Sequence, residues 1–172
     1  VRKRKTDKIS SFNDGLSIVK WDNHRADGQA VHNPGSDRPD FDVPLMRYAE
    51  VLMIEAEANY RLGNANEALN YINQVRDRAG AEALTADKLS LETICDEWCR
   101  EFYAEGRRRS DLVRFGVFAG NSRGLNGNMY VWDWKGGSAD GRIVDSHFNA
   151  YPFPATEIQG NPKLKGHQNP GY

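Results

Sequence analysis

The chain has 172 residues, of which 39% are hydrophobic and 27% are charged, and this balance excludes a disordered protein. The length suffices for one domain with a sizeable core. Its 23 Lys and Arg against 24 Asp and Glu leave a net charge of −1, so bulk electrostatic binding of nucleic acid is excluded. The longest aliphatic run, Val51–Ile54, is far shorter than the roughly 20 residues of a membrane-spanning helix.

Residues 1–43 read as an irregular lead-in, with glycines and prolines among scattered charges. One apolar alternation, Leu16–Trp21, is compatible with a short strand. The basic N-terminus has no apolar stretch behind it and no initiating Met. We therefore expect the chain to be a piece of a longer protein.

The helical region is predicted over 44–116, beginning with a helical hairpin. Pro44 suits a first turn and Gly63 a C-terminal stop, which predicts a helix over 44–62 with apolar stripes on two sides. A helix with one apolar face follows over 65–79. The pair has the length of a tetratricopeptide repeat, about 34 residues, and such repeats need about three units in a stack. We therefore expect the first helix to be buried on two sides by helices that this chain lacks.

Two further helices are predicted over 88–105 and 107–115, separated by a bend at Gly106. Beyond them, 117–172 is expected to hold loops, short strands and an extended tail. Alternation over Met129–Trp134 predicts one of these strands. Repeated prolines near the C-terminus predict a tail without regular structure. We expect this tail to be anchored on the helical body by the side chains Tyr151, Phe153, Ile158 and Leu164.

The sequence offers weak signals for catalysis and for metals. Cys95 and Cys99 lie on one helix face without further ligands nearby, which favours two small core residues. Glu97, Glu101 and Glu105 could in principle serve glycoside hydrolysis. The arginines that follow them favour structural ion pairs instead. We predict no cofactor, no metal site and no catalytic residue.

Aromatic residues supply the candidate ligand site, which consists of Tyr130, Trp132 and Trp134. In a strand, both tryptophans would point to one face, where a flat indole can stack on the apolar face of a sugar ring. Ordinary packing of this segment onto the helices is the simpler interpretation, since large aromatic side chains are usually well buried.

Four blocks of sequence, in order, resemble the SusD/RagB family of outer-membrane nutrient-binding lipoproteins. They are DVPLMRYAEVL with AEA at 42–58, EALxxINxVRxRAG at 67–80, EFxxEGxRxxDLxRxG at 101–116, and YPFPxxEI, NPxL and QNPGY within 151–172. The family's pattern spaces five charged residues across two helix ends, where we expect a structural ion-pair network of Glu101, Glu105, Arg108, Asp111 and Arg114.

The resemblance implies a mostly α fold: tetratricopeptide-like hairpins in an α/α superhelix, with long irregular loops and a small β element. It implies that 1–172 is a single C-terminal region of a lipoprotein on the outer leaflet of the outer membrane. Its lipid anchor, the only expected membrane contact, would lie upstream of this chain. The implied partners are an oligosaccharide and a SusC-like TonB-dependent transporter, and the implied activity is non-catalytic. The alternatives are a tetratricopeptide-type protein-interaction module and a glycoside hydrolase-associated domain.

Overall fold

The computed structural model describes residues 6–11, 13–16, 20, 24–25, 27–32, 42–120, 125 and 130–172. Four helices carry the core: α1 (Tyr48–Arg61), α2 (Ala65–Arg78), α3 (Leu91–Glu101) and α4 (Arg108–Arg114). Shorter helical segments follow the chain around them: η1 (Ala86–Lys88), η2 (Lys135–Gly137), η3 (Ser146–Asn149), α5 (Ala155–Gly160) and η4 (Pro162–Leu164). The mostly α prediction is therefore confirmed. The predicted small β element is wrong for the described residues, none of which lies in a strand.

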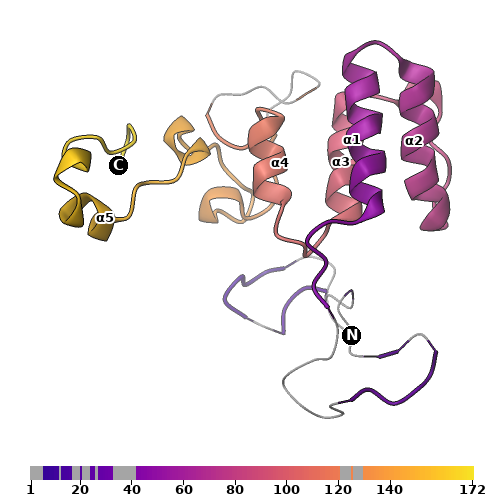
Figure 1. Ribbon diagram of the computed structural model, residues 1–172, viewed down its shortest axis with the longest axis horizontal. Helices are drawn as coiled ribbons and strands as arrows, with labels where there is room; N and C mark the ends of the chain where they lie inside the picture. Colours follow the sequence, from indigo (N-terminus) through magenta and orange to yellow (C-terminus); the bar gives the residue numbers. More distant parts are fainter. Residues whose placement is uncertain are drawn as a thin grey trace.

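Helices α1 and α2 form the predicted hairpin, and α3 lies against both of them (Figure 1). Gly63 closes α1 with a positive φ of 86° that few other residues adopt. Helix α1 begins at Tyr48 rather than at residue 44, because Arg47 is extended, with φ −145° and ψ 157°. With this extended backbone, the Arg47 side chain bonds Glu101 and Glu105.

Helix α3 begins with a capping box that fixes its first residue. The Ser90 side chain accepts a hydrogen bond from the Thr93 backbone N–H at 3.1 Å, and Thr93 Oγ1 accepts one from the Ser90 N–H at 2.8 Å. Such reciprocal bonds satisfy two N–H groups that a helix start leaves open. The helix ends at Glu101, four residues earlier than predicted, because the chain leaves helical geometry at Phe102 and Ala104.

The core lies between these four helices. Trp98 of α3 is 1% exposed, and Met53, Ile72 and Ile94 are fully buried. Within this chain α1 is buried on one side: Leu52 and Ala56 are buried, but Val51 and Ile54 are about half exposed. Burial of the second side by helices that this chain lacks stays a prediction. Helix α1 thus buries only one of its two apolar stripes.

The C-terminal segment extends away from α1 and α2 on the far side of α4 (Figure 1). The prediction of a tail without regular structure is wrong, because this segment contains α5 and folds back on itself. Of the expected anchors on the helical body, Tyr151 does contact α4. The Gln168 side chain bonds the backbone of Phe153 in both directions, and the Asn169 amide donates to the Tyr151 carbonyl at 2.6 Å. Its described contact with α4 is made by Arg109, whose guanidinium lies 3.8 Å from the Tyr151 ring centroid. The predicted strand Leu16–Trp21 lies mostly outside the described residues.

Candidate functional site

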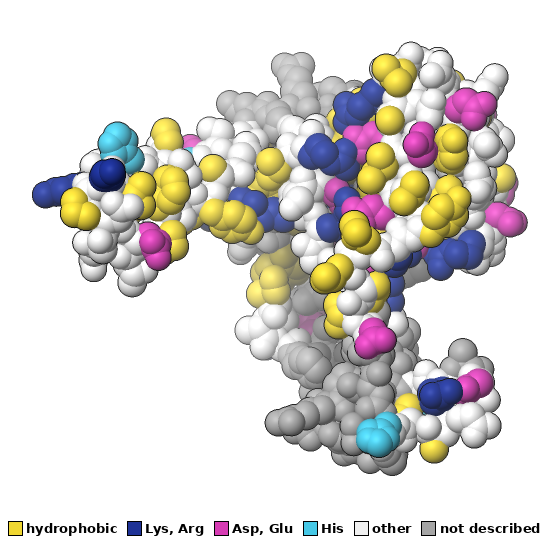
Figure 2. Space-filling view, viewed as in Figure 1, with side chains coloured by type: hydrophobic (Ala, Val, Ile, Leu, Met, Phe, Trp, Pro, Cys, Tyr) yellow, Lys and Arg dark blue, Asp and Glu magenta, His cyan; other side chains and the backbone are white. Residues whose placement is uncertain are grey.

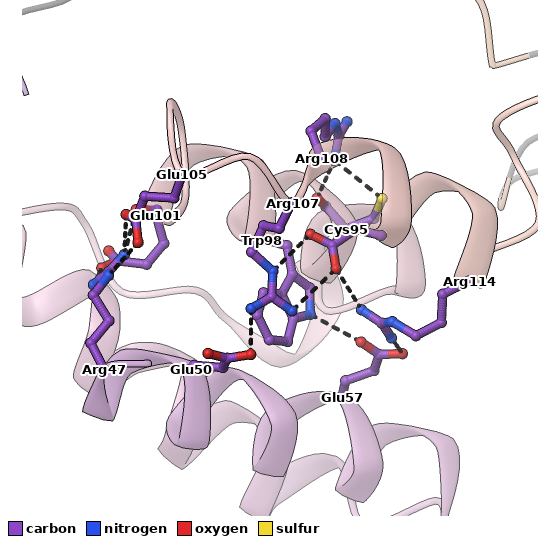
Figure 3. A network of polar contacts seen from close by, with 11 residues as sticks. Arg47, Glu50, Glu57, Cys95, Trp98, Glu101, Glu105, Arg107, Arg108 and Arg114 are labelled. Atoms are coloured by element: carbon purple, nitrogen blue, oxygen red, sulfur yellow. Dashed lines mark hydrogen bonds and ion pairs between the residues drawn. The ribbon is translucent and has the colours of Figure 1, made fainter. Parts of the chain in front are cut away.

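A network of charged side chains joins α1, α3 and α4 inside the molecule (Figure 3). Glu57 of α1 is 5% exposed and accepts a hydrogen bond from the Trp98 indole at 2.9 Å. Its other carboxylate oxygen pairs with Arg61 at 2.9 Å and with Arg114 of α4. A buried carboxylate is tolerated only when it is paired in this way.

Asp111 of α4 is the second buried carboxylate of the network, at 1% exposed. It pairs with Arg107 and with Arg114, each at 3.2 Å. Arg107 reaches across to Glu50 of α1 at 2.5 Å, and its guanidinium lies 4.2 Å from the Trp98 ring centroid. The same arginine therefore closes the core by an ion pair and by a cation–π contact.

Arg47 makes a second charged cluster at the end of α3. Its guanidinium binds both carboxylate oxygens of Glu105 at 2.8 Å and the Glu101 carbonyl at 2.7 Å. Lys20 also donates to Glu105. Burial alone would raise the pKa of Glu105, but the hydrogen bonds from Arg47 and Lys20 outweigh it and lower that pKa below its ordinary value of 4.5.

The structure divides the five residues of the expected network. Glu101 and Glu105 meet Arg47, whereas Asp111 and Arg114 belong to the cluster around Trp98. Arg108 joins neither cluster, and instead donates to the Cys95 carbonyl and to the Tyr130 hydroxyl, each at 2.8 Å.

Sequence reasoning missed Arg47 and Glu57, although both lie within the first block that carried the family resemblance. The position of Glu57 could have indicated its burial, because it directly follows Ala56 on the buried side of α1.

The carboxylates considered for hydrolysis are all held by arginines. Glu97 pairs with Arg76 at 2.5 Å and with Arg100 at 3.0 Å, and Glu101 pairs with Arg78 at 2.6 Å. Such ion pairs favour a structural role for these side chains over acid–base catalysis.

An aromatic pocket of about 540 Å³ opens between α3, α4 and the segment that follows residue 129. Its lining combines apolar, aromatic and polar side chains: Glu92, Cys99, Arg108, Leu112, Tyr130, Val131 and Trp132. Such mixed linings are typical of sites for small organic ligands.

Two of the three predicted aromatic residues meet at this pocket. The Tyr130 hydroxyl accepts a hydrogen bond from Arg108 at 2.8 Å and donates one to Asp96 at 2.9 Å. Burial is the main cause that raises the pKa of Tyr130, so the hydroxyl stays a donor. Trp132 is 38% exposed, and its ring meets the Tyr130 ring edge-on at a centroid distance of 6.1 Å.

Trp134 does not share this face, so the predicted strand with both tryptophans on one side is wrong. Its backbone turns into the left-handed region, with φ 68°. Its indole nitrogen donates to the Thr6 carbonyl at 3.0 Å, away from the pocket lining. The glycine-rich stretch that follows makes a tight loop here rather than a strand.

Two kinds of feature are not found among the described residues. Their His, Cys, Asp and Glu side chains form no group of three or more that could hold a metal ion. None of their helices combines the length and the apolar character that crossing a membrane requires.

The geometry defines a helical module with an aromatic pocket beside a charged helix junction. Comparison with known proteins identifies its family. The model of the SusD family matches residues 6–172, and the chain therefore belongs to that family. Its members are non-catalytic binding proteins.

Individual relatives agree with this assignment. The chain is 48% identical, over 99% of its own length, to the starch-binding protein SusD of Bacteroides thetaiotaomicron, of which it covers 28%. It is 30% identical, over 70% of its length, to the SusD-like protein P25 of Formosa agariphila, of which it covers 22%. The chain thus spans about a quarter of the length of these curated relatives.

A solved structure shows the same fold. A crystal structure of a SusD superfamily protein from Parabacteroides distasonis superposes on 78% of this chain and 28% of its own, with a TM-score of 0.57 at 24% identity. At this identity the match supports the fold alone.

Proposed function

We propose that the protein binds starch-type oligosaccharides without catalysis. The observation that carries this proposal is the 48% identity over 99% of the chain to a protein described as starch-binding. The aromatic pocket supports it, because the partly exposed indole of Trp132 offers a flat apolar face to a sugar ring. The pocket lining includes the polar side chains of Glu92 and Arg108, which suit sugar hydroxyls.

Delivery of the sugar to a transporter is the second part of the proposal. The protein would act as one C-terminal region of a lipoprotein on the outer leaflet of the outer membrane, anchored by a lipid upstream of residue 1. It would pass oligosaccharides to a SusC-like TonB-dependent transporter. The family resemblance supports this role, and co-purification of the tagged protein with such a transporter from outer membranes tests it. Recovery of the protein without any transporter would contradict it.

Calorimetric titration with maltoheptaose tests sugar binding, with cellohexaose as a control of different linkage. Trp132→Ala should weaken maltoheptaose binding by roughly tenfold, because aromatic stacking contributes on the order of 1 kcal/mol beyond area burial. Trp134→Ala is the matched control, since Trp134 lies outside the pocket lining and bonds Thr6. It should lower stability and leave the affinity unchanged. Equal affinity of Trp132→Ala and the unaltered protein would exclude Trp132 from sugar binding.

Protein interaction through α1 is the second candidate function, and one surface favours it. Apolar side chains gather over α1 in Figure 2. They belong to a stripe in which Tyr48 is 71% exposed, Ile54 52% and Leu62 76%. Exposed apolar patches of this kind commonly bind other helices.

Selection from a phage-displayed library of amphipathic helical peptides tests this second candidate. Peptides enriched by the unaltered protein and lost with Ile54→Glu would support helix binding by α1. If no peptide is enriched and the protein binds maltoheptaose, helix binding by α1 is contradicted and sugar binding is the function that remains.

A further inference from the structure

Lys135 is a buried lysine that contacts two residues of the aromatic pocket, Tyr130 and Trp132. It is 6% exposed, although lysine is among the residues most seldom buried. Its ammonium donates to the Tyr130 carbonyl at 2.6 Å and to the Val117 carbonyl at 3.4 Å. Within the described part of the chain, its bonded partners are thus backbone oxygens and not carboxylates.

The Lys135 ammonium also faces an aromatic ring. Its nitrogen lies 4.5 Å from the centroid of the Trp132 ring, which is the geometry of a cation–π contact. Because water is largely excluded around the ammonium, this attraction is stronger than at an exposed site. Burial also lowers the pKa of Lys135, which shows that the charge is kept here at a cost.

The contacts of Lys135 join two residues of the pocket lining to the backbone that follows α4. One carbonyl belongs to Tyr130, the second belongs to Val117 after α4, and the ring belongs to Trp132. The Lys135 backbone N–H in turn bonds the Trp132 carbonyl at 3.0 Å. The backbone and the side chain of Lys135 therefore contact both Tyr130 and Trp132, the two ends of the aromatic segment.

We infer that Lys135 is a positioning residue that fixes the Trp132 indole, and with it the sugar-stacking face of the pocket. This inference rests on the proposed sugar function and adds to it the residue that orients the platform. An indole held before binding loses less side-chain freedom when a ligand stacks on it. A buried ammonium can hold the indole while Trp132 stays partly exposed to a ligand.

The test compares Lys135→Met, Lys135→Arg and the control Lys88→Met, which removes the same charge from an exposed lysine. Two quantities are measured on the full chain: the ¹⁵N–¹H signals of the tryptophan indoles without ligand, and the affinity for maltoheptaose. Lys135→Met should shift the Trp132 signal more than the Trp134 signal and weaken binding by about three- to tenfold. Lys135→Arg keeps a cation at the ring and should retain most of the affinity of the unaltered protein for maltoheptaose.

A double-mutant cycle with Trp132→Leu shows whether Lys135 acts through the indole. Once the indole is gone, Lys135→Met should weaken binding little further. An equal loss in both backgrounds, or an unchanged Trp132 signal in Lys135→Met, would overturn the inference. If Lys135→Met does not fold, the indole signals of Lys135→Arg are compared with those of the unaltered protein. A shift of the Trp134 signal as large as the shift of the Trp132 signal would contradict a specific role of Lys135 in positioning Trp132.

The outcomes separate the inference from the proposed function. A displaced Trp132 signal in a protein that binds maltoheptaose supports both. If the Trp132 signal is displaced in Lys135→Met but the unaltered protein binds no maltoheptaose, the proposed sugar function is contradicted. Lys135 would then position the indole, but not for a sugar, and the inference as stated would be overturned.

Discussion

The indole nitrogen of Trp98 on α3 donates a hydrogen bond to the carboxylate of Glu57 on α1, 2.9 Å away. Both side chains are buried, at 1% and 5% exposed. The largest core side chain is thus joined to a charge that two arginines also hold. Removal of the charge would leave the buried indole N–H of Trp98 without its acceptor, which is costly, and would take one partner each from Arg61 and Arg114.

Replacement of this carboxylate gives the first prediction. Glu57→Ala should lower the free energy of unfolding by about 1–3 kcal/mol, because the buried indole N–H of Trp98 loses its charged acceptor. Urea denaturation measures the loss. Glu55→Ala, at an exposed glutamate two residues earlier in α1, is the matched control and should change stability by no more than about 0.5 kcal/mol. Equal effects of the two substitutions would contradict a structural role for the network.

Arg108 supplies the second prediction, which concerns the wall of the pocket. Its guanidinium bonds the Cys95 carbonyl and the Tyr130 hydroxyl, each at 2.8 Å. Arg108→Ala should therefore lower the free energy of unfolding by about 1–3 kcal/mol, since both acceptors lose a charged donor. Thermal unfolding followed by circular dichroism measures it, and an unchanged midpoint would show that these bonds contribute nothing.

Local pattern predicted the helices well, and distant contacts explain where it failed. Spacings of three and four residues placed α2 over Ala65–Arg78 within a residue of the prediction, because its apolar face and the glycine after it are local signals. The start of α1 was missed because Arg47 bonds Glu105, 58 residues away. The turn at Trp134 was missed because alternation alone cannot distinguish a strand from a loop rich in positive φ angles.

The candidate site was predictable only in part, for a similar reason. The sequence pointed to Tyr130 and Trp132, which do meet at the pocket. It could not supply Arg108 and Leu112 as their neighbours, since these come from α4 and reach the pocket only through the packing of α4 on α3. The burial of Lys135 could not be predicted, because nothing local in the sequence indicates it.

The third prediction concerns acid, through the ion pair of Glu105 with Arg47 and Lys20. The folded protein lowers the pKa of Glu105 below 4.5, so the unfolded chain binds a proton there more readily. The stability that this carboxylate contributes is therefore complete above about pH 4.5 and is lost as the pH falls through the lower folded pKa.

Denaturant unfolding at neutral pH and at about pH 3 measures this effect. Glu105→Gln should narrow the difference in unfolding free energy between the two conditions, because the amide cannot take up the proton. Glu82→Gln makes the same change at an exposed glutamate and is the control. A Glu105→Gln protein with the same acid response as the unaltered protein would show that Glu105 does not carry this dependence.

The last prediction concerns Gly141, which closes the loop behind the aromatic pocket. It adopts φ +70°, and a Cβ added there would lie 2.2 Å from the Trp132 carbonyl oxygen and 2.5 Å from the Val131 side chain. Gly141→Ala therefore has two costs: the strain of a positive φ, roughly 1–2 kcal/mol, and a displacement of the Trp132 backbone. Gly137→Ala separates them, because Gly137 has φ +78° and open space where the Cβ would lie. Both variants should lose stability to denaturant, but only Gly141→Ala should also weaken maltoheptaose binding, since it alone moves the residue that carries the indole. Equal affinities in the two variants would mean that the position of Trp132 does not matter for the sugar.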